Sequence, residues 1–176
     1  MKIVYLTNNI DPKNGWGRYA SELILSVKKL GHEVAILKEV DDGFEGEVLL
    51  KRGLGMFLSA LKIIKYLKNC DIIHALDVYP YGIVAYLANT FLRKKLVITA
   101  QGTYSIAPFY SIKTKYLAKL ACNSADVIIA ISNYTKNELL KQAKLKRIEV
   151  INHGIDLDKF YKERGVSDEI YILRVG

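Results

Sequence analysis

Two glycines near the amino terminus have the spacing of a phosphate-binding loop. Gly15 and Gly17 lie in Asn14-Gly-Trp-Gly-Arg-Tyr-Ala20, which follows an apolar run and opens an amphipathic one. Backbone N–H groups and the helix dipole attract phosphate at such a junction. The pattern Gly-x-Gly-x-x-Ala also matches the dinucleotide-binding fingerprint, and Glu39 stands where a ribose-binding acid would lie. Taken alone, this pattern predicts NAD binding.

The position of these glycines argues against a dinucleotide. In the dinucleotide fold the glycines form a tight turn directly after the strand, whereas here Thr7 to Asn14 intervene. A long loop of this kind can present its N–H groups to a phosphate that arrives from outside the domain. Two alternatives stay open: an NAD-dependent oxidoreductase or dinucleotide-binding module, and a pair of glycines that only permits a sharp turn.

Short β-branched runs alternate with amphipathic stretches along the chain. The predicted strands are Ile3–Leu6, Glu33–Leu37, Ile72–His74, Leu96–Thr99, Val127–Ala130 and Ile148–Ile151, with a further short one at Val48–Leu50. The predicted helices are Gly17–Leu30, Leu54–Lys68, Tyr81–Leu92, Tyr110–Cys122 and Asn133–Lys141. Strands that are continuous apolar runs indicate a parallel sheet covered by helices. We therefore predict an α/β, Rossmann-like, doubly wound domain that binds ligands beyond the carboxyl ends of its strands.

The composition indicates a globular protein with a basic surface. The chain has 176 residues, of which 51% are hydrophobic and 25% charged, as in a globular domain. The net charge of +8 favours an anionic partner such as a nucleotide diphosphate or a phospholipid surface, although an ordinary solvated, lysine-rich surface explains it equally well. No nucleic-acid-binding motif occurs, and we do not expect nucleic acid as a partner. Cys70 and Cys122 fit buried thiols in a reducing cytoplasm.

Five motifs in order resemble family 4 retaining glycosyltransferases of the GT-B fold. They are Asn14–Leu23 with Leu30-Gly-His-Glu-Val34, Asp71-Ile-Ile-His-Ala75, Val97-Ile-Thr-Ala-Gln-Gly-Thr103, Ser124–Thr135 and Val150-Ile-Asn-His-Gly-Ile-Asp156. The resemblance implies that residues 1–170 form the N-terminal, acceptor-side domain. Residues 171–176 would begin the first strand of a C-terminal donor-binding domain, and the isolated chain would be inactive.

The resemblance also implies the reaction. A sugar would pass with retention from a nucleotide-sugar donor to a hydroxyl of a glycan, glycolipid or lipid-linked saccharide. The family needs no metal and no cofactor besides its donor substrate, because basic groups and backbone amides stabilise the leaving diphosphate.

Residue roles follow from the resemblance in four groups. The donor diphosphate loop would comprise Gly15, Trp16, Gly17 and Arg18. Catalytic roles would fall to Gln101 and His74, acceptor binding to Asp77, Tyr79, Gly102, Thr103 and Ser132, and the hinge to Asn152, His153, Gly154 and Asp156. Many relatives carry His where this chain has Gln101, and Gln is unable to act as an acid or base. Alternatively, His74 is a structural histidine at a strand end, Asp77 caps the following helix, and Arg18 is a solvated surface group.

Two predicted helices mix aromatic residues with lysines, around Met56–Tyr66 and Phe109–Lys119. Basic amphipathic helices can lie on anionic lipid, although the same pattern also describes an ordinary helix with its apolar face in the core. We therefore expect a cytoplasmic protein, with peripheral association at the inner face of the membrane as an open alternative.

Overall fold

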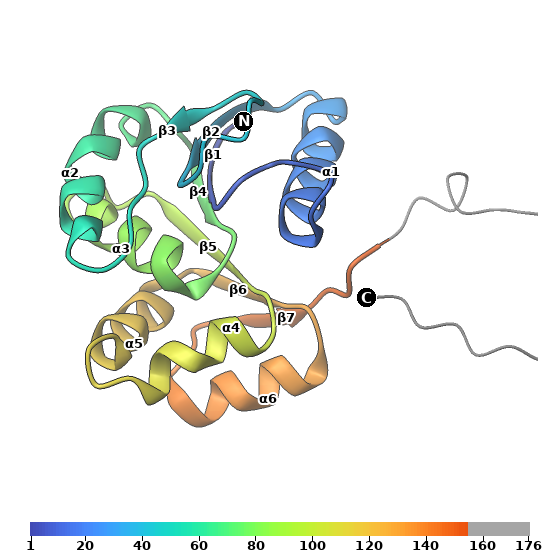
Figure 1. Ribbon diagram of the computed structural model, residues 1–176. Helices are drawn as coiled ribbons and strands as arrows, with labels where there is room; N and C mark the ends of the chain where they lie inside the picture. Colours follow the sequence, from blue (N-terminus) through green and yellow to red (C-terminus); the bar gives the residue numbers. More distant parts are fainter. Residues whose placement is uncertain (155–176) are drawn as a thin grey trace, which may run out of the picture.

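A computed structural model describes residues 1–154 and shows one seven-stranded sheet (Figure 1). All strands are parallel, in the order β3-β2-β1-β4-β5-β6-β7. Their bounds are β1 Lys2–Thr7, β2 Glu33–Lys38, β3 Glu47–Val48, β4 Ile72–Ala75, β5 Lys95–Ala100, β6 Val127–Ala130 and β7 Ile148–Val150. The expected Rossmann-like α/β class is confirmed, and with it the predicted strands.

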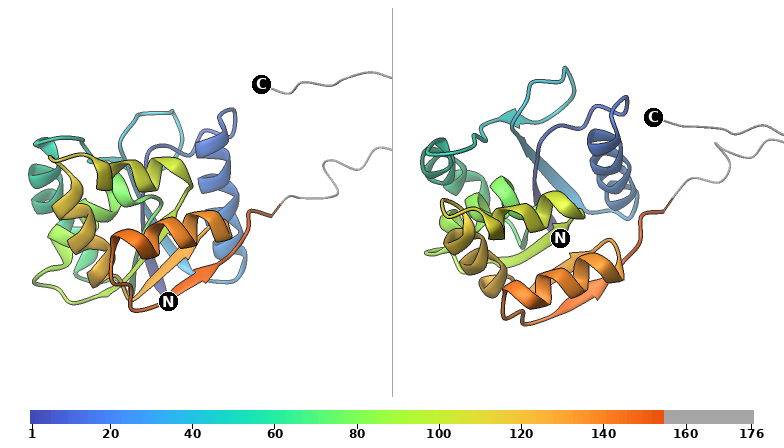
Figure 2. Two further views of the ribbon diagram at one scale, coloured as in Figure 1. Left: turned by 90° about the horizontal axis from the view of Figure 1, so that it is seen from below. Right: turned by 60° about the horizontal axis from the view of Figure 1, so that its bottom comes forward.

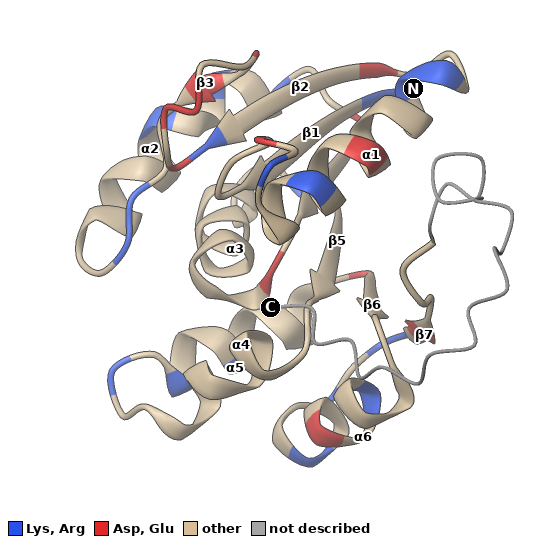
Figure 3. Ribbon diagram, turned by 45° about the vertical axis from the view of Figure 1, so that its right-hand side comes forward, with Lys and Arg blue, Asp and Glu red and all other residues tan. Residues whose placement is uncertain are grey.

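Helices cover both faces of this sheet. They are α1 Gly15–Lys29, α2 Gly55–Leu67, η1 Val78–Gly82, α3 Ile83–Asn89, α4 Thr103–Ile106, η2 Ala107–Tyr110, α5 Lys115–Ser124 and α6 Asn133–Gln142. Helix α1 lies on one face, and α2, α3 and α5 lie together on the other (Figures 1 and 2). An acidic turn, residues 41–47, leads into β3 (Figure 3). No helix in residues 1–154 is both long and apolar enough to cross a bilayer.

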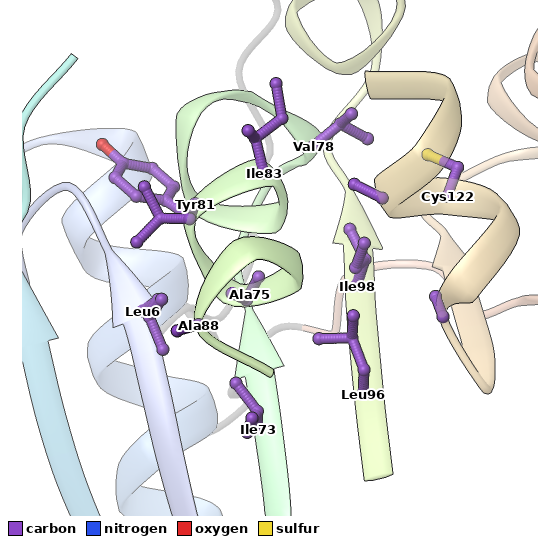
Figure 4. Packing of buried hydrophobic residues seen from close by; sticks show 14 of the residues in the cluster. Leu6, Ile73, Ala75, Val78, Tyr81, Ile83, Ala88, Leu96, Ile98 and Cys122 are labelled. Carbon is purple, nitrogen blue, oxygen red and sulfur yellow. The ribbon is translucent and has the colours of Figure 1, made fainter. Parts of the chain in front are cut away.

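Alternation along β1 divides the core in two. Ile3 and Tyr5 pack with residues of α1, including Ile24. Val4 and Leu6 point to the other face and join the larger core under α2, α3 and α5. Figure 4 shows side chains of this larger core, with Leu6 of β1, Ile73 of β4 and Ile98 of β5 in one cluster with Ala88 of α3. Because side chains alternate across a strand, one buried strand supports both layers.

The strand order reverses direction between β1 and β4. The chain goes from β1 to β2 on one side, and later from β4 to β5 on the other. In open parallel sheets, ligands bind in the crevice that forms where the connections diverge in this way. The loops after β1 and β4 border this crevice and are where a site is expected.

Candidate functional site

A pocket of about 1140 Å³ opens at this reversal point. Its wall combines the loop after β1, the start of α2, the η1 turn after β4, and the segment from α4 to α5. The lining residues are Asn8, Asn9, Asn14, Trp16, Arg52, Gly53, Leu54, Met56, Phe57, Asp77, Tyr79, Tyr81, Tyr104, Ala107, Pro108, Ser111, Lys113, Thr114 and Leu117. Aromatic walls with a few polar groups suit a ligand that has both apolar and hydroxyl-bearing surfaces.

Two asparagines, Asn9 and Asn14, hold the loop after β1 in place. Asn9 Oδ1 accepts hydrogen bonds from Asn14 Nδ2 at 3.0 Å and from the Asp11 amide at 3.1 Å. Asn14 caps α1, because its Oδ1 accepts from the Gly17 amide at 2.7 Å. The Asn14 side chain therefore has a definite structural task at the start of α1.

Glu39 joins separate parts of the pocket wall. Its carboxylate accepts hydrogen bonds from Tyr81 Oη at 2.5 Å, Arg52 Nε at 2.6 Å and Asn8 Nδ2 at 3.1 Å. Burial by itself would raise the pKa of Glu39, but these bonds outweigh it and leave the pKa below its ordinary value. The ribose-binding position of the dinucleotide fingerprint is therefore already engaged by protein groups.

Asp77 is a buried acid in the pocket wall. Val78 N donates to its Oδ1 at 2.7 Å, and Ser105 Oγ donates to the same oxygen. Burial raises the pKa of Asp77 to about 7, and the two hydrogen bonds offset only part of this effect. Near neutral pH this carboxyl group can therefore donate as well as accept a hydrogen bond.

Gln101 follows β5, does not line the pocket and is connected to Asp77 through Ser105. Its backbone N–H donates to Ser105 Oγ at 2.6 Å, which links it to the Asp77 carboxyl. Its Nε2 is buried and has no hydrogen-bond partner within residues 1–154. Gly102 takes a φ of +75°, a value that favours glycine, and Thr103 begins α4. An unpaired buried amide donor of this kind carries a cost in stability.

The structure places His74 away from this pocket. The sequence predicted it as the last residue of its strand, but β4 continues to Ala75, and alternation along the strand directs the imidazole toward the α1 face. There Nε2 lies 2.8 Å from Thr99 Oγ1, and the ring lies 5.0 Å from that of Tyr5. Burial lowers the pKa of His74 to about 4, so the imidazole is neutral. Its position supports the structural interpretation of this histidine.

The two glycines of the loop differ in their surroundings, because Gly17 is buried and Gly15 is exposed. A Cβ on Gly17 would lie 2.0 Å from Asn9 Oδ1, whereas one on Gly15 would meet nothing within 4 Å. Trp16 lines the pocket and packs edge-on against Tyr104 at 5.7 Å. Arg18 lies on the exposed side of α1, where its Nε is 3.3 Å from Glu22 Oε1.

Ser132 caps α6. Its Oγ accepts a hydrogen bond from the Thr135 amide at 3.2 Å, and it does not line the pocket. We predict that Ser132→Ala lowers the free energy of unfolding by about 1 kcal/mol, as measured by urea denaturation, because one helix-end N–H loses its partner. Ligand affinity should stay unchanged, and a selective loss of affinity without loss of stability would show that Ser132 contacts the ligand instead.

The expected hinge residues lie where the described chain ends. Asn152 Nδ2 donates to the Ile131 carbonyl at 2.9 Å, and the His153 ring stacks on Tyr19 at 4.0 Å. With Gly154 they border a second hollow of about 480 Å³ beside α1. Asp156 and the predicted strand start at 171–176 lie outside the described residues.

Comparison with known families identifies the chain. The family model described as Glycosyltransferase Family 4 matches residues 13–159. The chain belongs to glycosyltransferase family 4. A curated relative, an uncharacterised glycosyltransferase of Methanocaldococcus jannaschii, is 32% identical over 124 residues, which cover 69% of this chain and 35% of the relative.

Solved structures show the same fold as this family 4 chain. Anabaena HepE in complex with UDP-glucose matches with a TM-score of 0.72 at 19% identity, over 90% of this chain and 45% of that one. A glycosyltransferase from Rickettsia africae matches with a TM-score of 0.62 at 22% identity, over 90% and 44% of the two chains. The UDP-GlcNAc 2-epimerase of M. jannaschii matches with a TM-score of 0.55 at 12% identity, over 82% of this chain and 45% of that one. The chain thus has the fold of the N-terminal half of a GT-B protein and spans less than half the length of these relatives.

Several pocket residues were not expected from the sequence. The structure adds Arg52, Tyr81 and Tyr104 to the predicted Trp16, Asp77 and Tyr79. Arg52-Gly53 directly precedes a predicted helix, and Tyr104 follows the Gly102-Thr103 motif, so both lay beside recognisable signals. The hydrogen bonds of Glu39 were not predictable from local sequence, because its three donors come from distant parts of the chain.

Proposed function

We propose that this family 4 chain is the acceptor-binding half of a glycosyltransferase. The observation that carries the proposal is the pocket at the β1/β4 reversal point, bordered by the α1 glycine loop on one side and η1 on the other. The whole enzyme would transfer a sugar from a nucleotide-sugar donor to a hydroxyl of a glycan, glycolipid or lipid-linked saccharide, with retention. The 176-residue chain would bind the acceptor and have no transferase activity.

The amino end of α1 is the proposed contact with the donor diphosphate. It carries no acidic residue in its first turn, and Gly15 is exposed with open space around it. The Gly17 amide is already bonded to Asn14, so the exposed end of the loop and the helix dipole would face the phosphates. Arg18 adds positive charge at the same helix end.

The acceptor would lie against the aromatic wall of the pocket. Trp16, Tyr79 and Tyr104 offer flat apolar faces to a sugar ring, and Asp77 offers a carboxyl group to its hydroxyls. The unpaired Gln101 amide is the proposed contact with the reacting sugar. Gly102 and Thr103 would shape the backbone beside it, while the bonds of Ser132 and His74 give these two residues structural roles.

The dinucleotide alternative gains no support from the site. Gly17 serves close packing on Asn9, and Glu39 is bonded to three protein groups. Within residues 1–154, no three His, Cys, Asp or Glu side chains lie near enough together to hold a metal ion. That the reaction needs no metal stays a prediction.

Transfer assays on the complete reading frame test the proposal. UDP-, GDP- and ADP-sugars would be tried with hydroxyl acceptors, and the anomeric configuration of the product would be read by NMR. Tyr104→Ala should raise the acceptor KM about tenfold and leave the donor KM unchanged, because loss of one aromatic contact costs about 1.4 kcal/mol. Tyr104 is exposed, so its removal spares the core.

Tyr134→Ala is the matched control, since Tyr134 is similarly exposed on α6 and lies outside the pocket. Equal effects of the two substitutions, or a Tyr104→Ala effect on the donor KM alone, would refute the acceptor assignment. Micromolar NAD binding by the chain would favour the oxidoreductase alternative.

A further inference from the structure

Lys38 is a fully buried lysine at the carboxyl end of β2. Alternation along the strand places its side chain on the same face as Ile36, which packs with residues of α1. Lysine is almost never fully buried unless its charge is paired. The ammonium group therefore needs partners close to this end of the sheet, beside the loop that follows β1.

The partners of Lys38 come from the acidic turn of residues 41–47. Lys38 Nζ forms an ion pair with Asp42 Oδ1 and donates a hydrogen bond to the Phe44 carbonyl oxygen at 2.7 Å. The Asp42 side chain is only 5% exposed, so both charges are withdrawn from water. Replacing a buried pair of this kind by apolar side chains often leaves stability unchanged or raises it. Stability alone is therefore a weak reason for the pair.

The second oxygen of Asp42 reaches the loop after β1. Asp42 Oδ2 accepts a hydrogen bond from the Ile10 amide at 2.6 Å. The loop has another anchor two residues earlier, where the Asn8 carbonyl oxygen accepts from the Val40 amide at 3.0 Å. Asn9 lies between these two anchors, so the segment that follows β2 holds the backbone on both sides of it.

Asn9 connects this segment to the amino end of α1. Its Oδ1 accepts a hydrogen bond from Asn14 Nδ2 at 3.0 Å, and Asn14 Oδ1 accepts from the Gly17 amide at 2.7 Å. Gly17 lies so close that a Cβ on it would be 2.0 Å from Asn9 Oδ1. Because closely packed groups transmit displacements, a shift of Ile10 would move the first turn of α1.

We propose that Lys38 and Asp42 are positioning residues for sugar transfer. Lys38 holds the Asp42 carboxylate, which fixes Ile10 and with it the neighbouring Asn9. Neither Lys38 nor Asp42 lines the pocket. Their effect on transfer rests on the proposed function, in which the amino end of α1 meets the donor diphosphate. Charge that develops there is stabilised by groups already in place, and a misplacement of about 1 Å can lower the rate about 100-fold.

Two double variants separate this role from stability. Both contain Lys38→Met, so neither leaves a buried lysine unpaired. Asp42→Asn keeps a side-chain oxygen that can accept the Ile10 N–H, whereas Asp42→Leu removes that acceptor at similar volume. In the complete reading frame, we expect Lys38→Met/Asp42→Asn to keep the wild-type kcat. Lys38→Met/Asp42→Leu should lower kcat at least about tenfold, and thermal melting should show that both variants are folded.

Hydrogen exchange measured by mass spectrometry tests the positioning without a sugar substrate. Peptides that cover residues 8–17 should exchange in Lys38→Met/Asp42→Asn as slowly as in the wild type. In Lys38→Met/Asp42→Leu they should exchange about tenfold faster, because the loop has lost one hydrogen bond. Peptides from α6 should exchange alike in all three proteins. A pair that served stability alone would give the two variants equal exchange and equal kcat, since both lack the ion pair.

Glu45→Gln is the matched control on the same acidic turn. Glu45 forms a more exposed ion pair with Lys28, which lies in the last turn of α1, at the opposite end of the helix from Gly17. Its loss should leave the exchange of residues 8–17 and the kcat at wild-type values. Lys38→Met/Asp42→Ala repeats the removal of the acceptor with a side chain too small to overpack the site.

The outcomes separate this proposal from the proposed function. Equal exchange of residues 8–17 in the Asp42→Asn and Asp42→Leu double variants would overturn the positioning role, whatever their kcat. Transfer with the same kcat in both would retain the glycosyltransferase and reject the positioning role. Faster exchange in the Asp42→Leu double variant alone, in a protein that transfers sugar to no acceptor, would keep the positioning of α1 and reject the glycosyltransferase.

Discussion

Replacing Gly17 with alanine should destabilise the protein by about 3 kcal/mol, as measured by urea unfolding. The added Cβ would lie 2.0 Å from Asn9 Oδ1, 2.4 Å from the Asp11 carbonyl oxygen and 2.6 Å from the Asp11 amide nitrogen. Two of these three neighbours are backbone atoms, so a change of rotamer cannot relieve the contact. Helix α1 would have to move away from the loop that follows β1, and acceptor affinity should fall with it.

Gly15→Ala provides the matched control. It is two residues away in the same motif, at the first position of α1, and its Cβ would meet nothing within 4 Å. We expect a change within about 0.5 kcal/mol, in the stabilising direction if any, because alanine favours the helix. A Gly17→Ala variant as stable as Gly15→Ala would show that the loop does not need this close approach.

Asp77→Asn should change how stability depends on pH. Burial raises the pKa of Asp77 to about 7 from its usual value near 4, and the native state therefore holds a proton that the unfolded state releases between these values. The contribution of Asp77 to the unfolding free energy of the wild type is fully present below about pH 4 and is lost as the pH rises through about 7. The loss is on the order of 4 kcal/mol.

Asparagine has no such proton, and its Oδ1 can still accept both hydrogen bonds that now end on Asp77 Oδ1. The variant should therefore match the wild type at pH 4 and exceed it in unfolding free energy at pH 8. His74 has the opposite effect on stability. Its pKa is about 4 in the native state, so as the pH falls below about 6.5 the unfolded state binds a proton that the native state does not, and stability decreases. Comparison of the two proteins at each pH cancels that contribution. A difference that stays constant with pH would contradict the prediction.

Local patterns in the sequence predicted most of the fold. The β-branched runs located the strands to within one or two residues, and the predicted helix Asn133–Lys141 corresponds to α6. The short turns α4 and η2 were missed. Ala107-Pro108 interrupts the helical pattern there, so only the later α5 was recognisable as part of the predicted helix.

The site was less predictable, because its contacts join distant residues. Arg52 lies thirteen residues from Glu39 and Tyr81 forty-two, so no local pattern could reveal their shared hydrogen bonds. His74 was misplaced for a smaller reason. It lies one residue before the end of β4, and alternation along the strand places its imidazole on the α1 face beside Tyr5, on the opposite side of the sheet from the larger core.

The bonds of Asn9 have a consequence for protein engineering. Its Oδ1 accepts hydrogen bonds from the Asn14 side chain and the Asp11 amide, and it lies too close to Gly17 for that residue to carry a Cβ. Asn9 also lines the pocket. Substitutions meant to alter acceptor choice at this position would also shift the helix proposed to face the donor. Libraries that aim at new acceptors should therefore keep the asparagine loop fixed and randomise the exposed opposite wall, at Phe57, Tyr104 and Lys113.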